Sequence, residues 1–134
     1  MRSVFVDANY WVALDLITDQ NHQAAMRHWR GLQGKLPPLV TTTYIFDEVV
    51  TLFKSRGYHA QAIQAGNNLR SPGIELVHVD EPLFDAGWAY FVQHADKQYS
   101  LTDCISFVLM SRRRMTHAFT FDHHFGQAGF TQVP

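Results

Sequence analysis

The stretch SVFVDANYW, residues 3–11, decides the fold of this chain, because a short apolar run ends there in a carboxylate. Residues 4–6 predict a buried strand, and Asp7 stands where that strand would leave its sheet. The same arrangement returns in HAFTFDHHF, residues 117–125, where a second apolar run leads into Asp122. A single Asp at such a place is usually a turn residue or a helix cap. Two strands that end in Asp need a common explanation.

The composition is that of one globular domain over residues 1–134. With 46% hydrophobic and 17% charged residues, the chain can bury a core and is too apolar for a disordered protein. A formal net charge of −1 argues against a surface that is basic everywhere, so a nucleic acid would have to meet a local basic patch. The single cysteine, Cys104, cannot form an intramolecular disulfide, which favours a cytoplasmic protein. No stretch approaches the roughly 20 apolar residues that span a bilayer, so we expect no membrane segment.

Strands alternate with helices along the chain, which predicts an α/β fold. We expect further strands over residues 39–42, 74–79 and 117–121 with a short fifth over 130–133, helices over 10–17, 20–31, 44–56, 58–70, 81–95 and 101–114, and caps at Thr43 and Asp80. Crossover helices imply a parallel sheet of four to five strands, covered by helices on both faces. Ligands of such sheets bind beyond the carboxyl ends of the strands, where Asp7 and Asp122 stand.

Two helices supply further candidate carboxylates. In SLTDCISFVLM, Asp103 stands in the first turn of a helix that is apolar on almost all sides. It could serve as the partner of Ser100 in a capping box, or it could face a site. In YIFDEVVTLFK, Glu48 lies at the rim of an apolar stripe and Asp47 on the polar face, so Glu48 is the residue aimed at the body of the protein. An ordinary surface position explains Glu48 equally well when it is taken alone.

The four carboxylates are more informative together than singly. Like charges held close together repel one another, and they stay ionised only with a cation or a hydrogen-bond donor between them. Asp7, Glu48, Asp103 and Asp122 offer oxygen ligands without a Cys or His partner at fixed spacing. Such a set suits Mg²⁺ or Mn²⁺ and not structural zinc. The residues therefore predict a cation site.

At this point the motifs resemble those of PIN-domain ribonucleases. VFVDANYW near the start, DEV about forty residues later, SLTDCISFVLM and then FTFDHHF follow the order and spacing of the acidic motifs in that family. At this length the chain looks most like a VapC-type toxin of a toxin–antitoxin pair. The resemblance covers almost the whole chain. It implies a three-layer α/β/α PIN-like fold and an RNA endonuclease that cleaves by metal-activated water.

The resemblance also implies cofactors and partners. Asp7, Glu48, Asp103 and Asp122 would hold one or two Mg²⁺ or Mn²⁺ ions, and one of the acids, Asp103 or Glu48, would take the proton of the attacking water. The partners would be an RNA substrate, a VapB-like antitoxin whose tail covers the site, and a second copy in a homodimer.

Other positions match the family less completely. Asn9 matches the small polar position of the first motif, where the resemblance implies that it orients a metal-binding carboxylate or a metal-bound water, and Ser100 and Thr120 would be hydrogen-bond partners of the ligands. Ala8 departs from the family pattern, because a hydroxyl residue is common there. The histidine pair at residues 123–124 also departs from it and leaves open an auxiliary role in substrate contact.

Two surface features point to partners. The densest basic group is Arg112, Arg113 and Arg114, which would contact the RNA backbone or interact favourably with the end of their helix. The helix predicted over residues 81–95 is apolar nearly all round, so it is either central or an interface. Phe84, Trp88 and Phe91 are its candidates for an exposed patch that would bind a second copy.

Two other functions compete with the nuclease. A phosphatase would use Asp7 as a nucleophile, but the familiar arrangement has a second Asp two residues on, where this chain has Asn9. A catalytically silent RNA-binding or scaffold module would keep the fold without the chemistry. The presence of all four acids argues against that module, because inactivity would leave no reason to keep buried charges.

Overall fold

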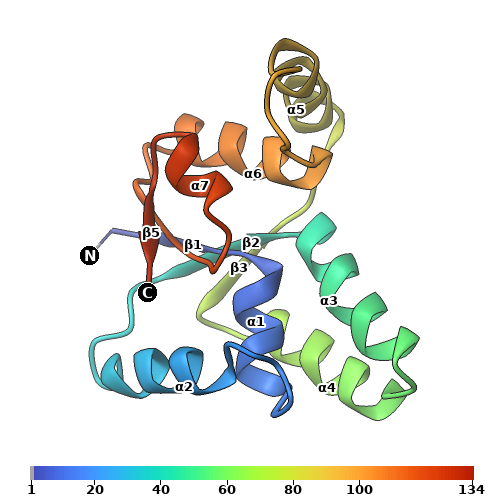
Figure 1. Ribbon diagram of the computed structural model, residues 1–134, viewed down its shortest axis with the longest axis vertical. Coiled ribbons are helices and arrows are strands. Elements are labelled where there is room, and N and C mark those ends of the chain that lie inside the picture. Colours follow the sequence, from blue (N-terminus) through green and yellow to red (C-terminus); the bar gives the residue numbers. More distant parts are fainter. Residues whose placement is uncertain (1) are drawn as a thin grey trace.

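The computed structural model describes residues 2–134 and places a five-stranded parallel sheet between two groups of helices (Figure 1). The strands are β1 (Val4–Val6), β2 (Leu39–Thr42), β3 (Ile74–Val77), β4 (His117–Phe119) and β5 (Thr131–Val133). The helices are α1 (Ala8–Asp15), α2 (His22–Gly31), α3 (Thr43–Ser55), α4 (His59–Leu69), α5 (Glu81–Gln93), α6 (Leu101–Arg112) and α7 (His124–Gln127). In Figure 1 α5 to α7 lie above the sheet and α1 to α4 below it. The α/β/α arrangement expected from the sequence is confirmed.

The strand order explains where a site can form. The order is β3-β2-β1-β4-β5, so the chain builds outward from β1 on one side and then crosses to the other. All neighbours are parallel, with Phe5 of β1 opposite Val40 on one side and Ala118 on the other. The order reverses between β1 and β4, and the carboxyl ends of strands at such a switch point are the usual ligand site of open α/β sheets. β1 is buried throughout and β4 is buried except at His117.

The start of α3 differs by one residue from the prediction. Thr42, not Thr43, is the cap: its extended backbone ends β2, and its hydroxyl accepts a hydrogen bond from the Ile45 N–H at 3.2 Å. Thr43 begins the helix, and its hydroxyl accepts a bond from the Val79 N–H at 3.1 Å. Either of two adjacent threonines can cap a helix, and the residue at which β2 ends decides which one caps α3.

Other boundaries move for similar local reasons. The first helix begins at Ala8 because the Asp7 carboxylate caps it, and the predicted strand over 117–121 ends at Phe119 because the chain turns toward the site. The short helix α7 has no counterpart among the predicted elements. It has four residues and no side-chain cap, so it is too short for its periodicity to be recognised.

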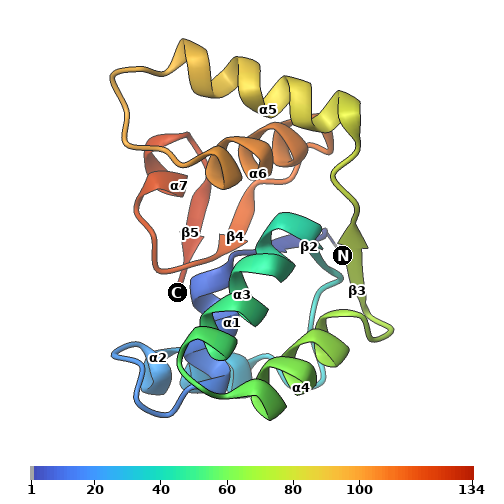
Figure 2. The same ribbon diagram turned by 90° about the vertical axis from the view of Figure 1, so that its right-hand side faces the viewer.

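Helix α5 forms the outermost layer, on the side of α6 that faces away from the sheet (Figure 2). Gly87 permits the close packing of the two helices, since a Cβ there would lie 3.1 Å from the Ile105 Cα. The opposite side of α5 leaves Phe84, Trp88 and Phe91 exposed, so of the two positions left open by the sequence the helix is not a central one. Among residues 2–134, no helix has the length and apolar character needed to cross a membrane.

Candidate active site

The four predicted carboxylates come from four separate elements and line one cavity of about 310 Å³. Asp7 follows β1, Asp122 follows β4, Glu48 lies on α3, and Asp103 lies in the first turn of α6. The cavity is at the carboxyl end of β1 and β4, where the strand order reverses. The structure therefore brings together all four side chains that the sequence singled out.

Asp7 is buried and is held by three hydrogen bonds. One carboxylate oxygen accepts the Ala8 N–H at 2.9 Å, which caps α1. The other accepts the Thr120 hydroxyl at 2.9 Å and the Asn9 amide at 3.2 Å. Burial raises the pKa of Asp7 to about 7, against the lowering effect of the Thr120 bond, and the charge of Asp103 adds to the rise. A carboxylate with these properties gains most from a cation beside it.

Asn9 and Thr120 tie the ends of β1 and β4 together. The Asn9 side-chain oxygen accepts the Phe121 N–H at 3.0 Å, and the fully buried Thr120 hydroxyl oxygen accepts the Asp122 N–H at 3.0 Å. Thr120 thus bonds the side chain of Asp7 and the backbone of Asp122 with one hydroxyl group. Asn9 and Thr120 therefore hold the two strand ends and the Asp7 carboxylate in place by hydrogen bonds.

Asp103 is both a helix cap and a member of the site. The Ser100 hydroxyl accepts the Asp103 N–H at 3.0 Å, and the Asp103 carboxylate accepts the Ser100 N–H at 3.1 Å, which completes a capping box. The carboxylate still lines the cavity with the other acids. Burial is the main cause that raises its pKa, with the charge of Asp122 acting in the same direction and the Ser100 bond opposing it. The two interpretations of this residue are compatible.

Glu48 closes the cavity from the side of α3. Glu48 is exposed as a whole residue, but partial burial of its carboxyl group raises its pKa. A hydrogen bond with Thr102 lowers that pKa, and the charge of Asp103 raises it further. Its neighbour Asp47 is exposed and accepts the Thr51 hydroxyl at 3.1 Å along the same helix. Asp47 does not line the cavity of the four carboxylates.

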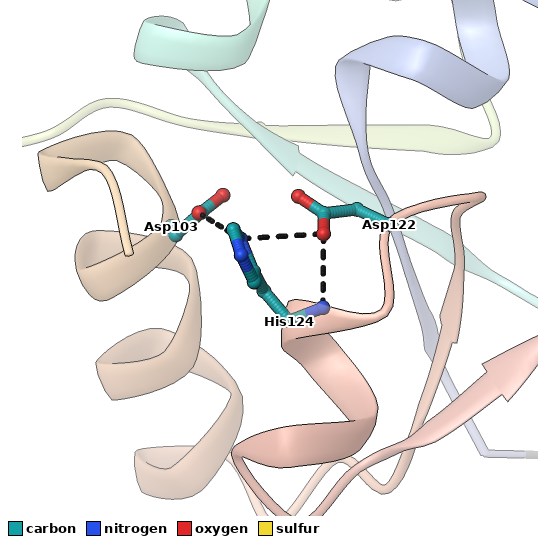
Figure 3. A group of neighbouring side chains, drawn as sticks. All are labelled: Asp103, Asp122 and His124. Carbon is teal, nitrogen blue, oxygen red and sulfur yellow. Dashed lines mark hydrogen bonds and ion pairs between the residues drawn. The ribbon is translucent and has the colours of Figure 1, made fainter. Parts of the chain in front are cut away.

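His124, at the start of α7, is the site residue that sequence reasoning did not assign. Its Nδ1 atom lies 3.3 Å from a carboxylate oxygen of Asp103 and 3.3 Å from one of Asp122 (Figure 3). The ligand atoms of these three residues all lie within 4.8 Å of one another. His123 instead points outward, with its side chain 76% exposed. The available signal was the Asp-x-His spacing directly after a strand, which places both side chains on the same side of a turn.

The donor set fits a divalent cation. Four carboxylates line one cavity, where the charge of Asp103 helps to raise the pKa of Asp7 and of Glu48, and the charge of Asp122 helps to raise the pKa of Asp103. Four acids in such proximity repel unless a cation compensates them, and carboxylate oxygens are the preferred ligands of Mg²⁺ and Mn²⁺. Among the described residues, the grouping of Asp103, Asp122 and His124 has the spacing of a metal-binding cluster.

The basic group Arg112 to Arg114 lies at the opposite end of α6. Arg113 is ten residues beyond Asp103, about 15 Å along a helix axis. Arg113 pairs with Glu75 through two contacts of 2.7 Å, and Arg113 and Arg114 line a different cavity together with Arg2. The structure does not bring this group to the carboxylates, so any contact of it with RNA would be remote from the site.

Comparison with known proteins identifies the family. The PIN domain family model matches residues 4–131. The chain is 32% identical over 130 residues to a Mycobacterium tuberculosis protein named 23S rRNA-specific endonuclease VapC20, covering 97% of each chain. The crystal structure of VapC20, described as a sarcin-ricin loop cleaving toxin, superposes with a TM-score of 0.89 over 97% of this chain and 98% of that one.

A more distant structure shares the fold alone. A toxin–antitoxin complex from Klebsiella pneumoniae superposes with a TM-score of 0.64 at 14% identity, over 98% of this chain and 96% of that one. The family model and the VapC20 match both extend over nearly all of the chain. The chain therefore belongs to the PIN-domain family, in the group that includes the VapC toxins.

Proposed function

We propose that this chain is a Mg²⁺- or Mn²⁺-dependent RNA endonuclease and the toxin of a type II toxin–antitoxin pair. The observation that carries the proposal is the meeting of four carboxylates from four elements in one cavity at the switch point of the sheet. Its similarity over nearly its whole length to VapC20, named as a 23S rRNA-specific endonuclease, supports RNA as the substrate. Sequence-specific recognition of RNA mostly targets loops and single strands, so we propose a structured RNA loop as the substrate class.

The residues of the cavity would have different roles in cleavage. A divalent cation held by Asp7, Glu48, Asp103 and Asp122 would activate water and stabilise the negative charge that develops on the phosphate. Asp7 and Asp122 are fixed relative to one another by Thr120. The Asp103 carboxylate is engaged in the capping box of α6 by the Ser100 N–H at 3.1 Å, whereas Glu48 is an exposed residue whose carboxyl group interacts with Thr102. We therefore propose that a carboxylate oxygen of Glu48 accepts the proton of the attacking water.

The test is cleavage of a labelled RNA pool that contains ribosomal RNA, with Mg²⁺, Mn²⁺ or EDTA. Asp103→Asn removes the charge while keeping an oxygen that can cap α6, and Asp47→Asn is the matched control because Asp47 is exposed and outside the cavity. We expect metal-dependent cutting by the wild type and by Asp47→Asn, and a loss of at least about 100-fold in Asp103→Asn. A folded, metal-supplied wild type that cuts no RNA would favour the silent RNA-binding module.

The same site would be the target of a VapB-like antitoxin. The proposal rests on the similarity to VapC20, which is described as a toxin, and on a fold shared with a toxin–antitoxin complex. We expect expression of the wild type in a bacterial cytoplasm to stop growth and expression of Asp103→Asn to be tolerated. Equal growth of the two strains at equal protein levels would refute the toxin assignment.

A second copy is the proposed partner of α5. Phe84, Trp88, Phe91 and Val92 are between 37% and 57% exposed, and the rings of Trp88 and Phe91 stack at 5.5 Å on the outer side of the helix. An aromatic cluster of this kind on a small domain marks an interaction surface. Sedimentation at micromolar concentration should give a dimer for the wild type and a monomer for Trp88→Glu, and a monomeric wild type would contradict the proposal.

A further inference from the structure

We propose that His124 is a direct ligand of the cation, through Nδ1, and that it makes the site prefer Mn²⁺ over Mg²⁺. The inference rests on the proposed function, because it concerns the same cavity. The contacts of this side chain carry it. Nδ1 faces both carboxylates, 3.3 Å from an oxygen of Asp103 and 3.3 Å from an oxygen of Asp122 (Figure 3).

The two distances also fit shared coordination of one cation. The contact of Nδ1 with Asp103 is a hydrogen bond, but at 3.3 Å it is longer than the about 2.7–3.2 Å of a good N–H···O bond. Ligand atoms about 2.1 Å from a cation are about 3.0 Å apart when they bind at right angles and about 3.4 Å apart at a tetrahedral angle. The observed 3.3 Å separations lie in this interval.

The imidazole is held in this position by its surroundings. The His124 backbone N–H donates to the Asp122 carboxylate at 2.9 Å, which fixes the start of α7 against the loop after β4. The ring packs edge-on against the ring of Tyr99, with centroids 5.5 Å apart. His124 is half-buried, and it lines the cavity with all four carboxylates. A ligand arranged in advance in this way loses little side-chain freedom when the cation binds.

A nitrogen ligand changes which cation the site selects. Mg²⁺ is a hard cation that takes oxygen ligands and keeps several waters, whereas imidazole is a good ligand for first-row transition metals. A site of carboxylates alone would suit both Mg²⁺ and Mn²⁺. A site in which Nδ1 takes one position favours Mn²⁺, because Mg²⁺ gains little from exchanging a water for that nitrogen.

The direct test is spectroscopic. Mn²⁺ is added to the wild type up to two equivalents, so that either position in the cavity is filled, and electron spin echo envelope modulation detects ¹⁴N bound to the ion. We expect the ¹⁴N modulation of a bound imidazole in the wild type and in His123→Ala, and its loss in His124→Ala. His123 is the matched control, since it is the neighbouring histidine and its side chain is 76% exposed.

Calorimetric titration with each metal alone gives the second readout. Loss of even an outer partner of a metal ligand typically lowers affinity about 10–100-fold, so His124→Ala should bind Mn²⁺ at least about tenfold more weakly. Its affinity for Mg²⁺ should change less. Mn²⁺ that binds the wild type without ¹⁴N modulation, while RNA is still cut, would overturn the role of His124 alone. A folded wild type that binds neither metal would overturn the cation site and the nuclease proposal with it.

Discussion

Replacing Thr120 by Val should uncouple the two strand ends that form the site. Val has nearly the shape of Thr, so the buried position stays filled while the hydroxyl is lost. That hydroxyl donates to the Asp7 carboxylate at 2.9 Å and accepts the Asp122 N–H at 3.0 Å. The substitution removes one of the three hydrogen bonds of the buried Asp7 carboxylate and the side-chain acceptor of the partly buried Asp122 N–H.

The structure gives the size of the effect. A hydrogen bond to a charged group contributes about 1.5–3 kcal/mol and a neutral one about 1 kcal/mol, so Thr120→Val should lower the free energy of unfolding by about 2–4 kcal/mol at pH 8, where Asp7 is ionised. Thr41→Val is the matched control, because Thr41 is equally buried and its hydroxyl donates one bond of 3.0 Å to the Val6 carbonyl. It should cost about 1 kcal/mol.

Urea unfolding and metal titration measure the two consequences. With a urea dependence of about 2 kcal/mol per molar, Thr120→Val should unfold at a urea concentration lower by about 1–2 M, and Thr41→Val by about 0.5 M. Thr120→Val should also bind Mn²⁺ about 10–100-fold more weakly, because a group that orients a ligand is lost, whereas Thr120→Ser should restore both properties. Equal destabilisation by the two valine variants with unchanged Mn²⁺ affinity would refute the reasoning.

Three further predictions concern Asp7, Gly87 and the basic group at the end of α6. Burial raises the pKa of Asp7 from 3.8 to about 7, so between these pH values the native state binds more protons than the unfolded state. The metal-free protein should therefore lose stability as the pH rises from 4 to 7, which thermal melts with EDTA measure. Added Mn²⁺ should stabilise the protein more at pH 8 than at pH 6. Gly87→Ala should lower the free energy of unfolding, measured in urea, by about 1–3 kcal/mol, because the new Cβ would meet Ile105. RNA cleavage below the melting temperature should persist, and an unchanged midpoint of urea unfolding would show that α5 shifts freely. Replacing Arg112 and Arg114 by Gln, with the paired Arg113 retained, should weaken RNA binding and flatten its salt dependence, and an unchanged salt slope would exclude the group from the RNA interface.

The fold and the acids of the site could be predicted from the sequence because both depend on local patterns. Short apolar runs that end in Asp indicate buried parallel strands, and parallel strands place their carboxyl ends at one edge. Helical periodicity separates Glu48 from Asp47 without knowledge of the fold, and Asp103 was a candidate because it stands in the first turn of a helix that is apolar on almost all sides. Each of these inferences needs only the few residues on either side.

What the sequence could not give depends on distant contacts. The choice between Thr42 and Thr43 as the cap of α3 depends on where β2 leaves the sheet. The position of His124 in the cavity depends on α7, which packs against α6, a helix more than ten residues earlier in the chain. The spacing of charges also does not show that Arg113 pairs with Glu75, 38 residues earlier. The sequence could not decide the role of Asp103, because a capping box needs only residues three positions apart, whereas a site needs residues from separate elements.

The bond between Thr120 and Asp7 joins residues that are 113 positions apart in the chain. A ribosome must therefore have released nearly all of this sequence before β4 can lie beside β1 and the four acids can meet. Until then the nascent chain has no complete cavity, and a product that terminates before Asp122 lacks one of its carboxylates. For a nuclease that would act on RNA in the cell that makes it, this order of assembly would keep a partly synthesised chain inactive, because the four acids meet only after residue 122 has joined the fold.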